Sequence, residues 1–209
     1  MMADDLPRSS PSPVLPDRGE TRTRRPQLLL RRFLRARQGG TAIEFALLVL
    51  PFLTVIFASI ETFVAFTGEQ LLANATETMA RRIRTGEVMT KAQFRQQFCN
   101  EISVMMPCSA AELSTPSKLY LDVRSFTSFA DIPVAVPRKT SASSSDLDTS
   151  GFAYAPGGAG TINVVRAYYR WTVITDLVRP YVTNLRPAGS SMPSDFLMVS
   201  TTTFRNEQF

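Results

Sequence analysis

The chain contains no histidine. Histidine is a common metal ligand and is the side chain whose unperturbed pKa lies closest to neutrality. Its absence excludes a Ser/His/Asp triad and a Cys/His catalytic pair. The two cysteines are also too few for a structural zinc site, which usually takes four Cys or His ligands. We therefore expect no metal, no cofactor and no enzymatic activity, and a membrane-tethered enzyme is the least favoured class of function.

Acidic residues are scarce near the N-terminus. Residues 1–38 hold nine arginines against four acids, and no acid interrupts the seven arginines from Arg22 to Arg37. The remaining residues hold equal numbers of basic and acidic groups. A nucleic-acid-binding domain spreads its basic groups over a folded face, whereas arginines beside an apolar segment mark the cytoplasmic side of a membrane. The pattern favours a topology signal, and we expect no nucleic-acid partner.

Charged residues are nearly absent from residues 41–66. The uncharged stretch from Phe45 to Ile60 is bounded by Glu44 and Glu61, and a membrane span needs about 20 apolar residues. The alternative is a buried core helix, but Pro51 is better tolerated in membrane helices. We predict one transmembrane helix, with the N-terminus cytoplasmic and the C-terminal domain on the opposite side. Glu61 either faces a partner helix or reaches the outer interface, and both alternatives stay open.

The composition divides the chain into four parts. Residues 1–26 contain five prolines and little apolar mass, which predicts a disordered cytoplasmic tail. Residues 27–40 form a basic juxtamembrane segment and a candidate leader, and the transmembrane helix of residues 41–66 follows. Residues 67–209 form the C-terminal domain. We expect the helix to continue to about residue 85, because apolar residues recur at helical spacing and Gly86 suits the C′ position; these residues are Leu72, Ala75, Met79 and Ile83.

The C-terminal domain combines helical and strand patterns. Residues 91–106 have helical spacing, and alternating runs around residues 119–124, 165–173 and 197–203 predict three strands. Residues 137–160 are rich in Ser, Asp, Pro and Gly, which predicts a loop. We expect an α+β fold, in which a small antiparallel three-stranded sheet packs on a long N-terminal helical stem.

The residues at the start of the apolar helix form the motif that says most about function. Gly39 and Gly40 end the basic segment, and Glu44 and Phe45 follow in the apolar helix. Small residues fit an extended protease site, and a carboxylate near a helix N-terminus is stabilised by the helix dipole. Alternatively, the glycines only separate a surface helix from the spanning helix, while Glu44 reaches the headgroups. The residues alone leave both interpretations open.

The segment from Gly39 to Leu48 resembles the processing region of Flp-type pilins and, more closely, of TadE-like pseudopilins of tight-adherence (Tad) systems. The resemblance covers about residues 30–209 through an ordered series of short matches, which lie at residues 81–86, 98–99, 108, 156–160, 164–171 and 204–209. Phe45 departs from the tyrosine usual in Flp pilins, and the chain is much longer than a major pilin.

The resemblance implies a minor pilin-like (pseudopilin) component of a Tad/Flp-type pilus assembly or secretion apparatus. It places the protein in the bacterial inner membrane with its C-terminal domain in the periplasm. The implied partners are a prepilin peptidase that cuts after Gly39, other Tad pilus assembly proteins and minor pilins. Gly40 would become the new N-terminus, although the glycine pair leaves the cut ambiguous by one residue. The alternative function is a permanently anchored periplasmic scaffold that is neither processed nor incorporated.

The two cysteines, Cys99 and Cys108, lie in the predicted periplasmic domain. Because that compartment is oxidising, two cysteines in one domain usually pair there. We predict a disulfide that joins the end of the second helix to the following loop. The alternative is a pair of buried free thiols.

Overall fold

The computed structural model describes residues 40–87, 89–176 and 179–209. The predicted tail, nearly all of the juxtamembrane segment and Gly39 lie outside these residues. The chain divides between Leu47 and Leu48, and residues 48–209 form one compact unit, in which most of helix α2 lies. The elements in chain order are α2 (Gly40–Arg84), α3 (Lys91–Ile102), α4 (Ala110–Ser114), β1 (Leu119–Phe126), the short 3-10 helix η2 (Phe129–Asp131), β2 (Tyr154–Ala155), β3 (Ile162–Thr172), α5 (Arg179–Val182) and β4 (Asp195–Arg205).

Helix α2 has 45 residues and confirms the predicted long stem. It ends in a Schellman motif, because the N–H of Gly86 donates to the carbonyl of Ile83 (3.1 Å) and the N–H of Glu87 donates to that of Arg82 (3.0 Å). Gly86 has φ +83°, a left-handed conformation that favours glycine. The sequence therefore predicted the end of this helix correctly, and Pro51 lies inside it.

The sheet has four strands in the order β2-β1-β3-β4. The predicted three-stranded antiparallel sheet is correct for β1, β3 and β4, which pair antiparallel, but wrong in number. The missing strand β2 lies in the predicted loop and pairs parallel to β1 through Val123 and Tyr154. Two residues are too few to show an alternating pattern, so β2 left no signal in the sequence. The sheet is therefore mixed.

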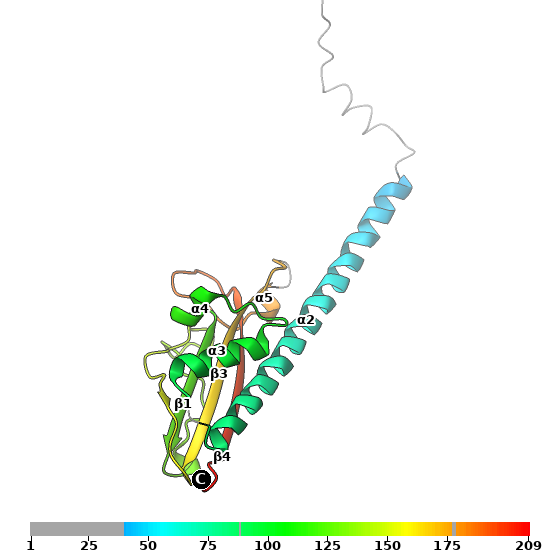
Figure 1. The fold of residues 1–209 in the computed structure, drawn as a ribbon. Coiled ribbons are helices and arrows are strands. Elements are labelled where there is room, and N and C mark those ends of the chain that lie inside the picture. Colours follow the sequence, from blue (N-terminus) through cyan, green and yellow to red (C-terminus); the bar gives the residue numbers. More distant parts are fainter. Residues whose placement is uncertain (1–39, 88, 177–178) are drawn as a thin grey trace, which may run out of the picture. The chain divides into compact units, whose positions relative to one another are not determined.

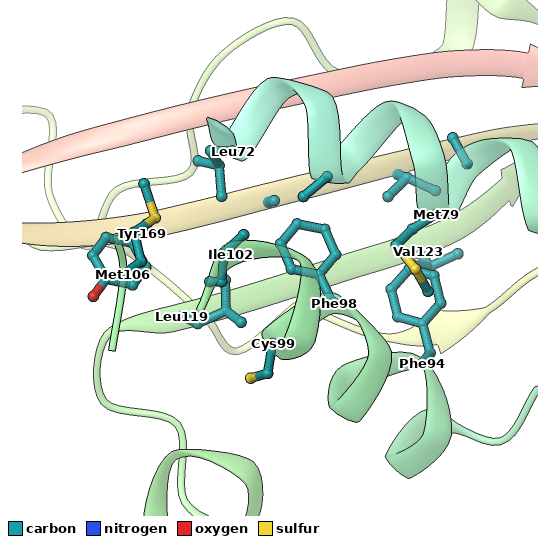
Figure 2. Close-up of a cluster of buried hydrophobic side chains, with 14 of the residues drawn as sticks. Leu72, Met79, Phe94, Phe98, Cys99, Ile102, Met106, Leu119, Val123 and Tyr169 are labelled. Atoms are coloured by element: carbon teal, nitrogen blue, oxygen red, sulfur yellow. The ribbon is translucent and has the colours of Figure 1, made fainter. Parts of the chain in front are cut away.

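The main hydrophobic core lies between the sheet and two helices. Figure 2 shows Leu72 and Met79 of α2 in one cluster with Phe94 and Phe98 of α3 and with Leu119, Val123 and Tyr169 of the sheet. Phe98 is fully buried, as are Leu72 and Met79. A Cβ at Gly68 would lie 3.2 Å from the terminal methyl groups of two methionines, Met106 and Met198. The C-terminal half of α2 is thus a core element of the domain.

Helix α3 begins with a capping box. The Thr90 side chain accepts from the N–H of Gln93, and the Gln93 side chain accepts from the N–H of Thr90. The helix ends at Ile102, four residues before the predicted limit at Met106. Residues 103–106 instead form a turn, in which the N–H groups of Met105 and Met106 both donate to the carbonyl of Ile102.

A second, smaller core covers the opposite face of β3. It contains Tyr168, Leu147, Leu185 and Leu197. The ring of Phe152 stacks on Tyr168 at 5.0 Å between centroids. The long segment between β1 and β3 therefore packs as a cover on this face. Because β3 is buried on both faces, seven consecutive residues in it, Asn163–Tyr169, are buried.

Helix α2 follows the sheet lengthwise, in the same direction as β4 (Figure 1). At one end the carboxylate of Glu61 contacts Ile174, just beyond β3. At the other end the N–H of Glu207 donates to the carbonyl of Arg84 (3.0 Å). We call the first of these the β3–β4 end of the sheet, since the connection between those strands lies there. It is the end of the domain from which the apolar part of α2 extends.

Candidate processing and assembly site

The candidate site begins at the first residue of α2, Gly40. A side-chain carbon added at Gly40 would meet nothing within 4 Å. The first four N–H groups of a helix have no intrahelical partner, so this end favours negative charge nearby. Glu44 follows one turn later on the same helix face as Gly40. Its side chain is exposed, and that of Phe45 is 67% exposed. The helix thus starts with an open first turn that has no acidic residue, and the carboxylate of Glu44 follows directly after it.

The surface of α2 from Phe45 to Ile60 carries no charged side chain and is largely apolar. By length and composition α2 could cross a membrane, and no residue of its apolar 18-residue stretch is buried. Exposed apolar surface on this scale needs lipid or other apolar helices around it. The large exposed side chains of the stem are Ile43, Phe45, Leu47, Leu48, Leu50, Phe52, Leu53, Val55, Phe57, Ile60, Phe63 and Phe66.

The stem also carries a match to a known protein family. Residues 39–81 match the model of the TadE-like protein family. The match confirms the resemblance noted in the sequence and includes Gly39, Gly40, Glu44 and Phe45. It relates the chain to Tad pilus systems and, together with the apolar helix, assigns the protein to the membrane. No curated protein and no solved structure matches the chain.

The TadE-like segment ends inside α2, at Arg81, so the sheet lies outside it. Its apolar and amphipathic parts have different environments. Up to Ile60 no residue of α2 is buried, whereas Ala65, Gly68 and Leu72 begin the buried face. The apolar first part of the segment is therefore exposed, whereas its second part packs against the domain.

Glu61 lies at the junction of these halves. Its Oε1 accepts hydrogen bonds from the N–H of Ile174 (2.8 Å) and of Thr175 (3.4 Å). Of the two alternatives for Glu61, a partner helix or the outer interface, the structure shows neither directly, because the carboxylate binds the backbone of its own domain. Sequence reasoning missed this contact, since 113 residues separate Glu61 from Ile174.

Cys99 and Cys108 are joined in a disulfide, with their Cα atoms 5.5 Å apart. The bond connects α3 to the segment before α4 and belongs to the main core, where Cys99 is buried. It lies in the domain rather than in the TadE-like segment. Among the predicted site residues, Gly40, Glu44 and Phe45 thus lie within the first two turns of α2, whereas the cysteines form a separate structural element.

Two buried carboxylates of the domain have several protein partners each. Glu112 accepts from the N–H groups of Ser117 (2.9 Å), Lys118 (2.9 Å) and Leu119 (2.8 Å), and lies 3.3 Å from Arg95. Burial alone would raise the pKa of Glu112, but the hydrogen bond from the Ser117 hydroxyl and those backbone N–H groups lower it below its ordinary value. These contacts hold the carboxylate ionised in a structural role.

Asp146 is the second such carboxylate. It lies 2.6 Å from Arg170 and 3.0 Å from Lys139. Burial would raise the pKa of Asp146, but the hydrogen bond from Lys139 and the charge of Arg170 lower it. Over the described part of the chain, no three His, Cys, Asp or Glu side chains converge as a metal site would require. The chemistry that this arrangement offers is charge pairing and apolar packing.

Proposed function

We propose that this protein is a minor pilin-like (pseudopilin) component of a Tad/Flp-type pilus assembly or secretion apparatus. It acts by membrane anchoring and subunit assembly rather than by catalysis. The observation that carries the proposal is the start of the TadE-like segment, where an open helical turn at Gly40 precedes Glu44 and an apolar stem that is exposed on all sides.

Processing supplies the charge that the first turn lacks. Cleavage after Gly39 by a prepilin peptidase leaves a positive amino group at Gly40. The cleaved stem then has a cation at its first residue and a carboxylate at its fifth, on a helix that is otherwise apolar. In a bundle of stems, Glu44 of one subunit offsets the amino group of its neighbour. An unpaired charge in that setting is costly, so this pairing fixes the register between neighbouring stems.

The location of the protein follows from the same features. The arginine-rich segment stays on the cytoplasmic side of the inner membrane, because positive residues flanking a span favour that side. The sheet domain then faces the periplasm. There it is available to other Tad assembly proteins and minor pilins.

N-terminal sequencing of the protein purified from membranes tests processing. Cleavage after Gly39 removes 39 of the 209 residues of this 23.2 kDa chain, a loss of about 4 kDa, and exposes Gly-Thr-Ala as the new terminus. A terminus at Thr41 would place the cut after Gly40 instead. A protein that retains the residues ahead of Gly39 in assembled machinery contradicts the pseudopilin role and supports the permanently anchored scaffold.

Substitution of Glu44 tests assembly. Glu44→Ala should abolish incorporation into pili or secretion complexes while leaving membrane insertion intact, and Glu44→Asp should retain part of the function because the charge remains. Glu69→Ala is the matched control, since it removes another carboxylate of the same helix beyond the apolar stretch. Normal piliation in the Glu44→Ala strain, with the protein processed at Gly39, would count against the charge-pairing mechanism.

A further inference from the structure

Three exposed apolar side chains lie at the β3–β4 end of the sheet. Ile174 is 84% exposed, Tyr181 is 88% exposed, and Val104, in the turn after α3, is 84% exposed. A single exposed apolar residue is ordinary on a protein surface. The significance of these three depends on their position relative to the membrane-spanning part of α2.

The position of Ile174 is fixed by Glu61. Its own N–H donates to the Glu61 carboxylate at 2.8 Å, so the Ile174 backbone lies at the level of Glu61 along α2. Tyr181 belongs to the same connection. Helix α5 is held to the end of β3, because the N–H of Arg179 donates to the carbonyl of Thr175 (3.0 Å).

Val104 reaches the same end from another element. It lies two residues before Met106, which packs against α2 at Gly68. Gly68 follows Glu61 by two helical turns. Figure 1 shows α5 and the connection between β3 and β4 beside α2 at this end of the sheet, where the apolar stretch leaves the domain.

The length of the span places the edge of the membrane beyond Glu61. The uncharged stretch from Phe45 to Ile60 is about 24 Å long at 1.5 Å per residue, which is shorter than the roughly 30 Å hydrocarbon core of a bilayer. Phe63 and Phe66 remain 69% and 58% exposed. Including them extends the apolar surface to about 33 Å. On the lipid-facing side, the hydrocarbon therefore ends near Phe66 rather than at Glu61.

This mismatch brings the domain into contact with lipid. The backbone of Ile174, at the level of Glu61, lies five residues, about 7 Å, to the membrane side of Phe66. We infer that the β3–β4 end rests in the bilayer surface, with Ile174, Tyr181 and Val104 at the boundary between acyl chains and headgroups of the leaflet where the domain emerges. Tyrosine is enriched at this depth because its ring is apolar and its hydroxyl is polar.

The contact also explains how the Glu61 carboxylate is tolerated at this depth in the membrane. A carboxylate inside the hydrocarbon is costly unless it has hydrogen-bond partners. The N–H groups of Ile174 and Thr175 supply partners for Oε1 on the domain side of α2, while Phe63 and Phe66 face lipid. The inference depends on the membrane span and not on whether the chain is cleaved or enters a filament.

Depth-dependent fluorescence quenching of the full chain tests this contact. Ile174→Cys, Tyr181→Cys and Val104→Cys are each labelled with an environment-sensitive fluorophore under non-reducing conditions, which keep the Cys99–Cys108 bond. Each variant is placed as a single copy in nanodiscs of phosphatidylcholine and phosphatidylglycerol. We expect a blue-shifted emission, strong quenching by lipids that carry a spin label near the headgroup, and weak quenching by aqueous iodide.

Two other apolar positions are the matched controls. Val134 is 96% exposed, and the adjacent Pro133 carbonyl accepts from Arg166 in the middle of β3. Phe209 is 61% exposed and lies beside Gly86, at the opposite end of the sheet. Labels at Val134→Cys and Phe209→Cys should be quenched by iodide and not by the labelled lipids. Equal iodide quenching at all five positions would overturn the inference, as would shielding of positions 174 and 181 without any quenching by lipid.

Discussion

The guanidinium of Arg95 and the carboxylate of Glu112 form an ion pair 3.3 Å long, with both side chains more than nine-tenths buried. Arg95 also donates to the carbonyl of Glu112 (2.7 Å) and to the carbonyl of Leu119 (2.7 Å). The pair therefore connects α3, α4 and the first residue of β1. These three elements all follow the TadE-like segment in the sequence.

Removing one member of this pair should be strongly destabilising. Glu112→Ala leaves the Arg95 charge buried without its partner, and such a change costs about 3–5 kcal/mol. The double variant Arg95→Met with Glu112→Ala should lose less than the sum of the two single variants, because no unpaired charge remains. Denaturant unfolding of the full chain in mild detergent measures all three.

A surface pair gives the control for this measurement. Arg84 and Glu207 lie 3.6 Å apart with side chains 44% and 59% exposed. Glu207→Ala should change the free energy of unfolding by less than about 1 kcal/mol, because exposed ion pairs are screened by water. Equal losses at Glu112 and Glu207 would contradict the assignment of the buried pair as a folding element.

Stability should fall in acid and stay flat around neutrality. The pKa values of Glu112 and Asp146 are lowered in the folded state from ordinary values of 4.5 and 3.8. The two ionised carboxylates therefore stabilise the folded state fully at pH values above their ordinary pKa values. This stabilisation is lost as the pH falls through their lowered pKa values in the folded state. The chain has no histidine, so no imidazole titrates between pH 5 and 8. Unfolding curves measured from pH 2 to 8 check this prediction. In Glu112→Gln the free energy of unfolding should fall less steeply at low pH.

The disulfide should stabilise the domain by closing a short loop. Cys99 and Cys108 are separated by nine positions in the sequence, for which the chain-entropy model gives about 2–3 kcal/mol. Replacing both cysteines by alanine should lower the free energy of unfolding by that amount without changing membrane insertion. Peptide mapping without reductant should recover the two cysteines in one linked fragment, and recovery of two free thiols would refute the bond.

The elements with a long periodic pattern could be predicted from the sequence. The helix of α2 follows from its apolar stretch and from Gly86, whose left-handed backbone ends it. The three long strands follow from their alternation, although β3 is buried on both faces. The capping box at Thr90 and Gln93 was not predicted, although the two residues fit the Thr-x-x-Gln pattern of such a cap. Local pattern thus accounts for most of the framework.

Contacts between polar residues far apart in the chain could not be predicted. Arg95 lies within an ordinary helical pattern, and nothing local indicates that its charge is buried against Glu112, 17 residues away. Strand β2 is defined by pairing with Val123 rather than by its own two residues. For the candidate site, the glycines and Glu44 were recognisable because they lie within six residues of one another in the sequence. The hydrogen bond between Glu61 and Ile174 depends on the tertiary fold.

The contact between Glu61 and Ile174 should restrain the domain at the end of the membrane span. Glu61→Ala removes the carboxylate oxygen that accepts from the Ile174 N–H. The loss of one hydrogen bond of about 1 kcal/mol predicts roughly fivefold faster hydrogen exchange at that amide. Exchange of the full chain in nanodiscs, followed by mass spectrometry over residues 173–176, measures the effect.

Two variants separate this restraint from general loosening of the helix. Glu61→Gln keeps an oxygen acceptor of the same size and should restore much of the protection, while Glu69→Ala removes a carboxylate two turns later and should leave residues 173–176 unchanged. If Glu61→Ala leaves exchange at these residues as slow as in the unaltered chain, the carboxylate does not hold the β3–β4 end to α2. Faster exchange confined to these residues, with α3 and β1 still protected, is the outcome that the contact at 2.8 Å predicts.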